Sequence, residues 1–220
     1  MTLRAAAAAA ICLLTYPAWA AEITWQGTTI TFTGPIAWAD VATFVQASRG
    51  ARILVLNSPG GEVDAAIAIG REVRRLKLET VVPQSALCAS GCSILFFAGV
   101  KRELHGSLGV HSAWIKETGL RSPLGTDRMI FCLELWGAPV RVLLDLNDTA
   151  PREMYWFGAA ELREFERMER LLDAEIARGR LPKDKQAARR QFFEEMRVLR
   201  KFMGSFGKQS EEETRDEKAD

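Results

Sequence analysis

The stretch Leu87-Cys88-Ala89-Ser90-Gly91-Cys92-Ser93 lies between an apolar, strand-like segment and the apolar run at 94–98. Small residues between two such segments predict a sharp turn from a strand into a helix. A serine at this turn places its hydroxyl beside the free backbone N–H groups of a helix N-terminus, which favour an anion or a developing oxyanion. A serine in this position is also typical of a helix N-cap. The rest of the sequence must decide whether Ser90 is a helix N-cap or a nucleophile.

The composition predicts one main globular domain with appendages. The chain has 220 residues, of which 48% are hydrophobic and 26% are charged, so it can bury one sizeable core. Its formal net charge of +1 comes from 29 basic and 28 acidic residues. Because nucleic-acid binding needs a strongly basic surface, no nucleic-acid partner is expected.

The first twenty residues predict a secretory signal peptide. One positive charge within Met1–Arg4 precedes an unbroken apolar stretch, Ala5–Leu14, and Ala18-Trp19-Ala20 has the small-x-small cleavage pattern. The apolar stretch is shorter than the roughly 20 residues of a membrane-spanning helix. We therefore expect cleavage after Ala20 and a periplasmic or secreted protein with no stable membrane span.

Export changes the interpretation of the cysteines. Cys12 leaves with the signal peptide, while Cys88, Cys92 and Cys132 remain where disulfides persist. An odd number leaves at least one thiol free or paired between chains. Cysteines and histidines are too few and wrongly spaced for a zinc site, so no metal is expected. A structural disulfide near the turn is expected, and its pairing is open.

The hydrophobic pattern of the mature chain predicts an α/β domain with crossover connections. Alternation over Ile23–Phe32 indicates a strand or hairpin with a turn at Gln26-Gly27, and the apolar run Ile53–Leu56 indicates a parallel strand buried on both faces. Further strands are expected at 79–83, where a short strand feeds the turn, at 108–111 and at 154–157. Helices are expected at 39–46, 65–76, 94–98, 128–135 and 138–146. The polar stretch Lys101-Arg102-Glu103 is expected to end a helix, and 115–128 to form an exposed loop.

The C-terminal part has a different composition from the domain at 21–165. Charges alternate with apolar residues at 161–178 and again at about 183–202, which predicts two charged helices within an extension at 166–206. They are expected to cover the flank of the domain, and self-association into a homo-oligomer is the alternative. Residues 207–220 form an acidic polar tail for which disorder is expected.

Three apolar strands end in residues of the types that act in catalytic sites. The segments are Asn57-Ser58-Pro59-Gly60-Gly61, Cys88-Ala89-Ser90-Gly91-Cys92 and Gly109-Val110-His111. In a parallel α/β arrangement these ends lie on one edge of the sheet, where loops build sites. Two adjacent glycines permit a positive φ and leave their N–H groups unobstructed, as an oxyanion hole requires.

A neutral imidazole near Ser90 would accept the hydroxyl proton during attack on a carbonyl. The chain has two histidines, His105 and His111. His105 lies in a polar stretch and is expected on the surface. His111 follows an apolar strand, which suits a base, although a structural role is the alternative.

The order and the residues of these segments resemble the motifs of the Clp protease proteolytic subunit family and its exported relatives. These proteins have the crotonase-like fold of stacked ββα units. The resemblance covers roughly residues 32–165. It implies that Ser90 is the nucleophile, that His111 is the general base, and that backbone N–H groups of Gly60 or Gly61 and of Gly91 form the oxyanion hole. It implies a peptide or protein substrate and no cofactor.

One departure from this family concerns the third catalytic residue. The family has an aspartate just before an aromatic strand, and that position falls near Met154. Glu153 is adjacent and is a candidate for orienting His111, while Asp148 and Asp145 are more remote candidates. A Ser–His pair without an orienting acid is expected to be slower.

Three functions follow as hypotheses. The first is an exported serine hydrolase, a peptidase that forms an acyl-enzyme through Ser90. The second is a catalytically inactive scaffold or peptide-binding protein of the periplasm. The third, acyl-CoA chemistry, is disfavoured because CoA is a cytoplasmic cofactor.

Overall fold

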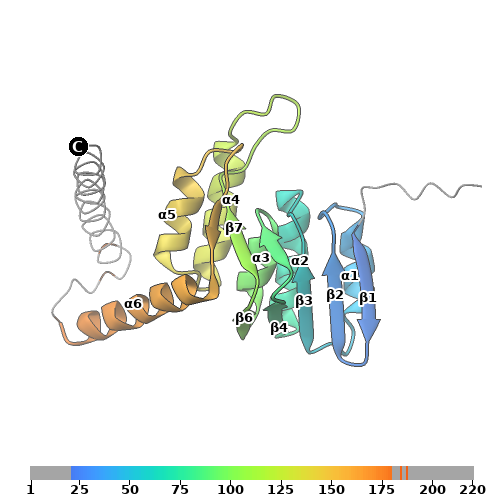
Figure 1. Ribbon diagram of the computed structural model, residues 1–220, viewed down its shortest axis with the longest axis horizontal. Coiled ribbons are helices and arrows are strands. Elements are labelled where there is room, and N and C mark those ends of the chain that lie inside the picture. Colours follow the sequence, from blue (N-terminus) through green and yellow to red (C-terminus); the bar gives the residue numbers. More distant parts are fainter. Residues whose placement is uncertain (1–20, 180–183, 185–186, 188–220) are drawn as a thin grey trace, which may run out of the picture.

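The computed structural model describes residues 21–179, 184 and 187, and it shows an α/β fold with two sheets (Figure 1). The large sheet has the strand order β1-β2-β3-β4-β6, and the small sheet has the order β5-β7-β8. The elements are β1 (Glu22–Gln26), β2 (Thr29–Thr33), α1 (Asp40–Ala47), β3 (Ile53–Asn57), α2 (Val63–Arg75), β4 (Glu79–Val82), β5 (Leu87–Ala89), α3 (Cys92–Ala98), β6 (Arg102–Leu104), β7 (Ser107–Val110), α4 (Pro123–Leu135), α5 (Val140–Asp148), β8 (Tyr155–Phe157) and α6 (Ala159–Ala177). The expected α/β class is confirmed.

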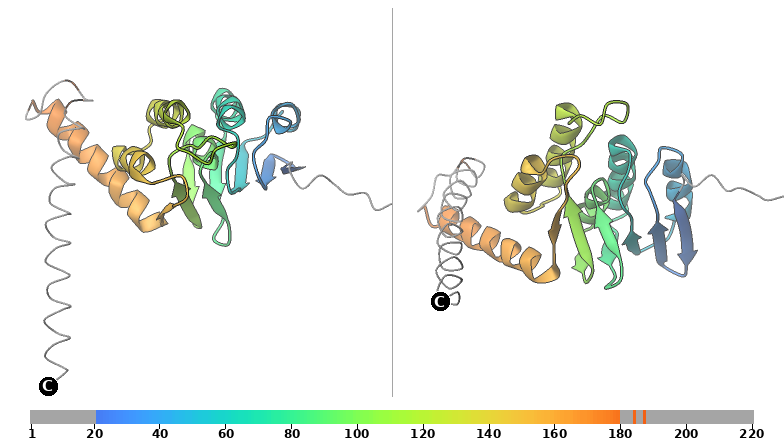
Figure 2. Two further views of the ribbon diagram at one scale, coloured as in Figure 1. Left: turned by 90° about the horizontal axis from the view of Figure 1, so that it is seen from above. Right: turned by 45° about the horizontal axis from the view of Figure 1, so that its top comes forward.

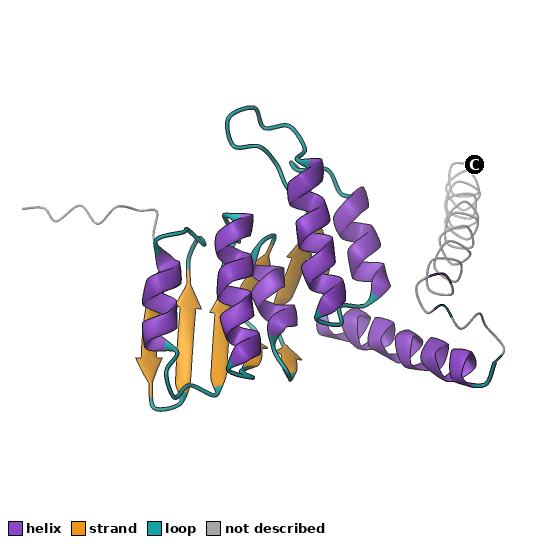
Figure 3. Cartoon of the chain, turned by 180° about the vertical axis from the view of Figure 1, so that it is seen from behind, coloured by secondary structure: helices purple, strands orange, loops and turns teal. Residues whose placement is uncertain are grey.

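The large sheet is covered by helices on one face. β1 and β2 form the expected antiparallel hairpin, and β2, β3, β4 and β6 are parallel. Helices gather over one face of this sheet (Figures 2 and 3). In β3, Leu54 and Leu56 are fully buried, whereas Ile53 and Val55 are only partly buried. The prediction that this strand is buried on both faces was therefore wrong, because no helix within residues 21–179 covers its second face (Figures 2 and 3).

The chain repeats the order of a strand in the large sheet, a strand in the small sheet and a helix. β4, β5 and α3 follow this order, and so do β6, β7 and α4. β5 and β7 are parallel, with Ala89 paired with Gly109, and an isolated parallel bridge joins Ser58 to Cys88. The segments that follow β3, β5 and β7 are thereby brought side by side, as expected for strand ends that build one site.

Three local predictions need correction. The strand at 79–83 does not feed the turn directly, because it is β4 of the large sheet and the separate strand β5 precedes the turn. Arg102 and Glu103 belong to the edge strand β6 rather than to a polar helix end. The exposed loop is shorter than expected, because α4 already begins at Pro123. Ser122 caps this helix by accepting the N–H of Gly125 at 3.1 Å.

The end of the described chain packs against the domain. β8 pairs antiparallel with β7, and α6 buries Leu162, Phe165 and Leu172. The predicted signal peptide, most of the predicted helix at 183–202 and the acidic tail at 207–220 lie outside the described residues. Among the helices of the described part, none combines the length and the apolar character that a membrane crossing needs.

Candidate active site

Ser90 lies on the predicted strand-to-helix turn in a strained backbone conformation. Its φ is +52°, in the left-handed region that residues with a Cβ rarely adopt. Its N–H donates to the carbonyl of Gly109 at 2.9 Å, and its own carbonyl accepts the hydroxyl of Ser93 at 2.7 Å. The N-cap of α3 is Gly91, and no side chain caps this helix. Ser90 is therefore not a capping serine, and its hydroxyl makes no hydrogen bond to the described residues.

A disulfide brackets this turn. Cys88 and Cys92 are bonded to each other, with their Cα atoms 5.1 Å apart, and both residues are fully buried. The sequence predicted a disulfide near the turn without its pairing, and the structure joins these two cysteines. Cys132 is free and buried, and burial raises the pKa of its thiol. The Ser90 turn is thus closed by a covalent bond within the core.

The Gly60-Gly61 turn packs directly against the Ser90 turn. Both glycines have a positive φ, +93° and +156°. A Cβ on Gly60 would lie 2.5 Å from the carbonyl oxygen of Ala89 and 2.8 Å from the nitrogen of Gly91. Any side chain larger than hydrogen would therefore separate the two turns. This contact explains physically why the first residue of the pair is glycine.

Two backbone N–H groups at this contact are uncommitted. The N–H of Gly60 donates to the buried hydroxyl of Ser58 at 3.1 Å. Within the described chain, the N–H groups of Gly61 and Gly91 have no acceptor. A Cβ on Gly91 would lie 3.4 Å from the nitrogen of Gly61, so the two groups are neighbours. Of the two alternatives that the sequence left open, Gly61 is the one with an available donor.

His111 follows β7 and lies beside the Ser90 turn in the parallel register of β5 and β7. It is buried, and its Nδ1 atom has no hydrogen-bond partner among the residues that the structure describes. Burial lowers the pKa of His111, and the backbone carbonyl of Pro151 opposes this shift. The imidazole is therefore neutral at neutral pH, as a general base requires. His105 is exposed as expected, with Nε2 3.6 Å from a carboxylate oxygen of Glu103.

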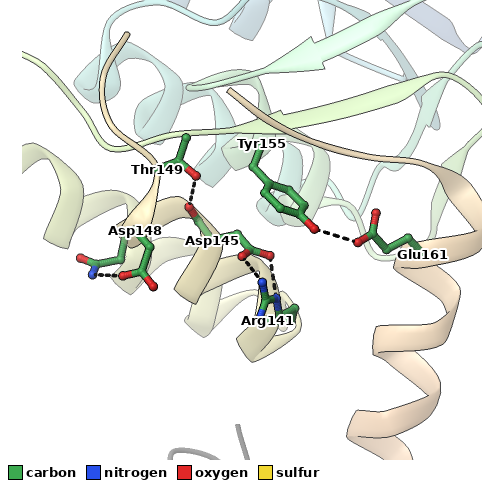
Figure 4. A network of polar contacts seen from close by, with 7 residues as sticks. Arg141, Asp145, Asp148, Thr149, Tyr155 and Glu161 are labelled. Carbon is green, nitrogen blue, oxygen red and sulfur yellow. Dashed lines mark hydrogen bonds and ion pairs between the residues drawn. The ribbon is translucent and has the colours of Figure 1, made fainter. Parts of the chain in front are cut away.

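None of the three acids proposed to orient His111 is hydrogen-bonded to its Nδ1. Glu153 is exposed. Asp145 is buried and binds the guanidinium of Arg141 through two hydrogen bonds of 2.8 and 2.5 Å (Figure 4). Asp148 accepts a hydrogen bond from the amide of Asn147 at 3.1 Å. The described backbone thus brings the turns of Ser90, His111 and Gly61 together without joining these acids to the imidazole.

Two positioning features had not been predicted from the sequence. The hydroxyl of Ser58 holds the N–H of Gly60, a role that its place directly after an apolar strand could have indicated. The segment after His111 is fixed by Ser112, whose N–H and hydroxyl both donate to the carbonyl of Thr149, at 3.0 and 2.8 Å. This second contact joins residues 37 positions apart, and no local pattern reveals it.

An open, charged groove has Glu62, the residue that follows Gly61, in its lining. It has a volume of about 510 Å³, and its lining includes Trp38, Glu62, Ile67, Arg71 and Arg128. The N–H of Trp38 donates to Glu62 at 3.2 Å, and Arg128 pairs with Asp64 at 2.5 Å. Arg71 makes no ion pair within the described residues. The groove therefore offers both apolar and charged side chains to a ligand.

The described residues contain no cluster of three or more histidine, cysteine, aspartate or glutamate side chains placed to hold a metal ion. No protein-family model and no curated protein sequence matches the chain. The chemistry of the site is therefore inferred from its own residues.

Proposed function

We propose that the protein is an exported serine hydrolase that cleaves peptides or proteins, on a fold of the Clp protease and crotonase type. One observation carries the proposal. Ser90 has a left-handed backbone on a strand-to-helix turn, next to the uncommitted N–H groups of Gly61 and Gly91. A strained turn exposes a nucleophile, and paired backbone donors stabilise the oxyanion that its attack creates.

The reaction uses each group in turn. The neutral imidazole of His111 accepts the proton of Ser90 as its oxygen attacks the substrate carbonyl. The N–H groups of Gly61 and Gly91 donate to the resulting oxyanion. The imidazolium then protonates the leaving amine, and water hydrolyses the acyl-enzyme by the reverse sequence. Because no acid in the described part of the chain is bonded to Nδ1, the site works as a Ser–His dyad and is slower than a triad.

Two further features support the proposed class and location. The repeated order of large-sheet strand, small-sheet strand and helix fits the stacked ββα units of the family that the sequence resembles. The Cys88–Cys92 disulfide fits an oxidising compartment, as the N-terminal signal pattern predicts. The groove of about 510 Å³ that Glu62 helps to line, directly after Gly61, is charged and supports the proposal of a peptide ligand.

A fluorophosphonate probe tests the proposal directly, because it reacts with activated serines. We expect it to label the mature protein and the Ser85→Ala variant, which replaces an exposed serine five residues away. Ser90→Ala should not be labelled. No labelling of the wild type, or equal labelling of Ser90→Ala, would overturn the proposal.

The unpartnered Nδ1 of His111 favours a second function, a binding protein that keeps the groove without catalysis. This alternative predicts peptide binding that persists in Ser90→Ala and His111→Ala, with no hydrolysis by the wild type. Isothermal titration with peptides, combined with product analysis by mass spectrometry, separates the two functions. Hydrolysis that depends on Ser90 would exclude the alternative.

A further inference from the structure

Asp40, the first residue of α1, is a buried carboxylate that holds the start of the described chain. It is only 4% exposed. Its Oδ1 atom accepts the N–H of Ala21 at 3.2 Å, and its Oδ2 atom accepts the N–H of Ala37 at 2.7 Å. Both contacts are made to neutral backbone amides. A buried carboxylate is most strongly stabilised by a positively charged donor.

The cleavage predicted by the sequence would supply that charge at the same atom. The small-x-small pattern places the cut between Ala20 and Ala21, and β1 begins one residue later, at Glu22. A signal peptidase would hydrolyse this peptide bond with water. Ala20 would keep the new carboxylate, and the nitrogen of Ala21 would become an ammonium. The nitrogen that lies 3.2 Å from Asp40 would thus gain a full positive charge.

We propose that Asp40 is a binding site for the N-terminal ammonium of the processed protein. The proposal depends on the cleavage position in the proposed export, and it is independent of hydrolysis. Before cleavage, Asp40 accepts a neutral N–H; after cleavage, it forms a partly buried ion pair with the ammonium of Ala21. Removal of the signal peptide therefore stabilises the folded domain as well as releasing it.

This ion pair is connected to the candidate active site through the backbone. Asp40 holds Ala37, and the adjacent residue Ile36 donates its N–H to Gly60 at 2.8 Å and accepts the N–H of Glu62 at 2.9 Å. A Cβ on Gly61 would lie 2.0 Å from the carbonyl oxygen of Ile36. Processing at Ala21 therefore stabilises the segment that supports the Gly60-Gly61 turn.

A thermodynamic cycle tests the site on chains that begin at Ala21. Each chain is prepared with a free or an acetylated N-terminus, in the wild type and in Asp40→Asn, and unfolded with denaturant. Acetylation should lower the folding equilibrium constant of the wild type about tenfold, because it removes a charge-assisted hydrogen bond. It should have almost no effect in Asp40→Asn. Asp64→Asn, which removes an exposed carboxylate, should retain the tenfold effect.

Three outcomes would overturn the proposal: an equal effect of acetylation with and without Asp40, no effect in the wild type, or a mature N-terminus other than Ala21 in the exported protein. If Asp40→Asn does not fold, a chain that begins at Glu22 replaces it. That chain moves the ammonium by one residue, and it should show the same tenfold loss relative to the chain that begins at Ala21. All measurements are unfolding equilibria and none uses hydrolysis, so failure of the proposed hydrolase would not affect them.

Discussion

The backbone N–H of Ser90 donates to the carbonyl of Gly109 at 2.9 Å, which fixes the turn after β5 to the last residues of β7. His111 lies two residues beyond Gly109, so one backbone hydrogen bond aligns the two segments that carry the proposed nucleophile and base. The side chains of Ser90 and His111 take no part in this alignment. Substitutions of these side chains should therefore remove chemistry and leave the fold in place.

The pH dependence of stability should report the burial of His111. Burial lowers its pKa in the folded protein below the ordinary value of about 6.5. Below that value the unfolded chain binds a proton that the folded protein resists, so the free energy of unfolding should fall as the pH drops from about 7 toward the folded pKa. His111→Gln should flatten this part of the curve, measured by urea unfolding at several pH values. The exposed control His105→Gln should keep the wild-type slope, and an unchanged slope in His111→Gln would contradict the expectation.

Gly60→Ala should be far more destabilising than Gly50→Ala. Both glycines have a similar positive φ, +93° and +80°, so alanine is strained at either position by about 1 kcal/mol. A Cβ at Gly50 meets nothing within 4 Å, whereas one at Gly60 meets the Ser90 turn at 2.5 Å. Overpacking adds about 1–3 kcal/mol at Gly60. Denaturant unfolding of both variants measures the difference, and equal losses would show that the two turns do not approach so closely.

Reduction of the Cys88–Cys92 disulfide should destabilise the protein by about 2 kcal/mol. The bond closes a loop of a few residues, and the loop-entropy relation gives this magnitude for so short a loop. The variant Cys88→Ala/Cys92→Ala should show the same loss and should no longer respond to reductant. Cys132→Ala should respond to reductant like the wild type, because Cys132 is free. Insensitivity of the wild type to reductant in unfolding experiments would contradict this expectation.

Glu153→Gln should change hydrolysis much less than the roughly 10⁴-fold loss that follows removal of an orienting aspartate from a catalytic triad. Glu153 is exposed, and Nδ1 of His111 is bonded to no acid within residues 21–179. Steady-state kinetics on a peptide substrate measures the effect. A loss approaching 10⁴-fold, with unchanged stability, would identify Glu153 as the orienting residue.

Asp145→Asn should instead lower stability, by about 2 kcal/mol. Asp145 neutralises Arg141, whose side chain is only 16% exposed, so the substitution leaves a poorly hydrated guanidinium without its charged partner. Thermal unfolding of Asp145→Asn beside Asp148→Asn, whose carboxylate is exposed, compares the two acids of α5. Equal stability of Asp145→Asn and the wild type would contradict this role.

Much of the fold could be predicted because its longer elements have strong hydrophobic patterns. The hairpin over 23–32, the helix at 65–76 and the turn at Ser90 follow from the spacing of apolar residues and from small residues at the turn. β5 and β6 were harder to foresee, because each has three residues. Such short strands exist through their pairing with β7 and β4, which local sequence does not encode.

The candidate site also depends on contacts that local sequence does not encode. Gly60 and Gly61 could be singled out by their type, but the choice between their N–H groups depends on the hydroxyl of Ser58. The environment of His111 depends on the carbonyl of Pro151, 40 residues away. Backbone carbonyls have no sequence signature, so only the folded arrangement reveals this contact.

The burial of both half-cystines sets an order of events during maturation. Cys88 and Cys92 are completely inaccessible to solvent once α3 has packed into the core. An oxidising enzyme or small disulfide donor can therefore reach the two thiols only in a nascent or locally opened chain. The disulfide therefore forms before the domain is fully packed or during local opening, and a chain that packs first keeps two buried thiols around Ser90 until it opens.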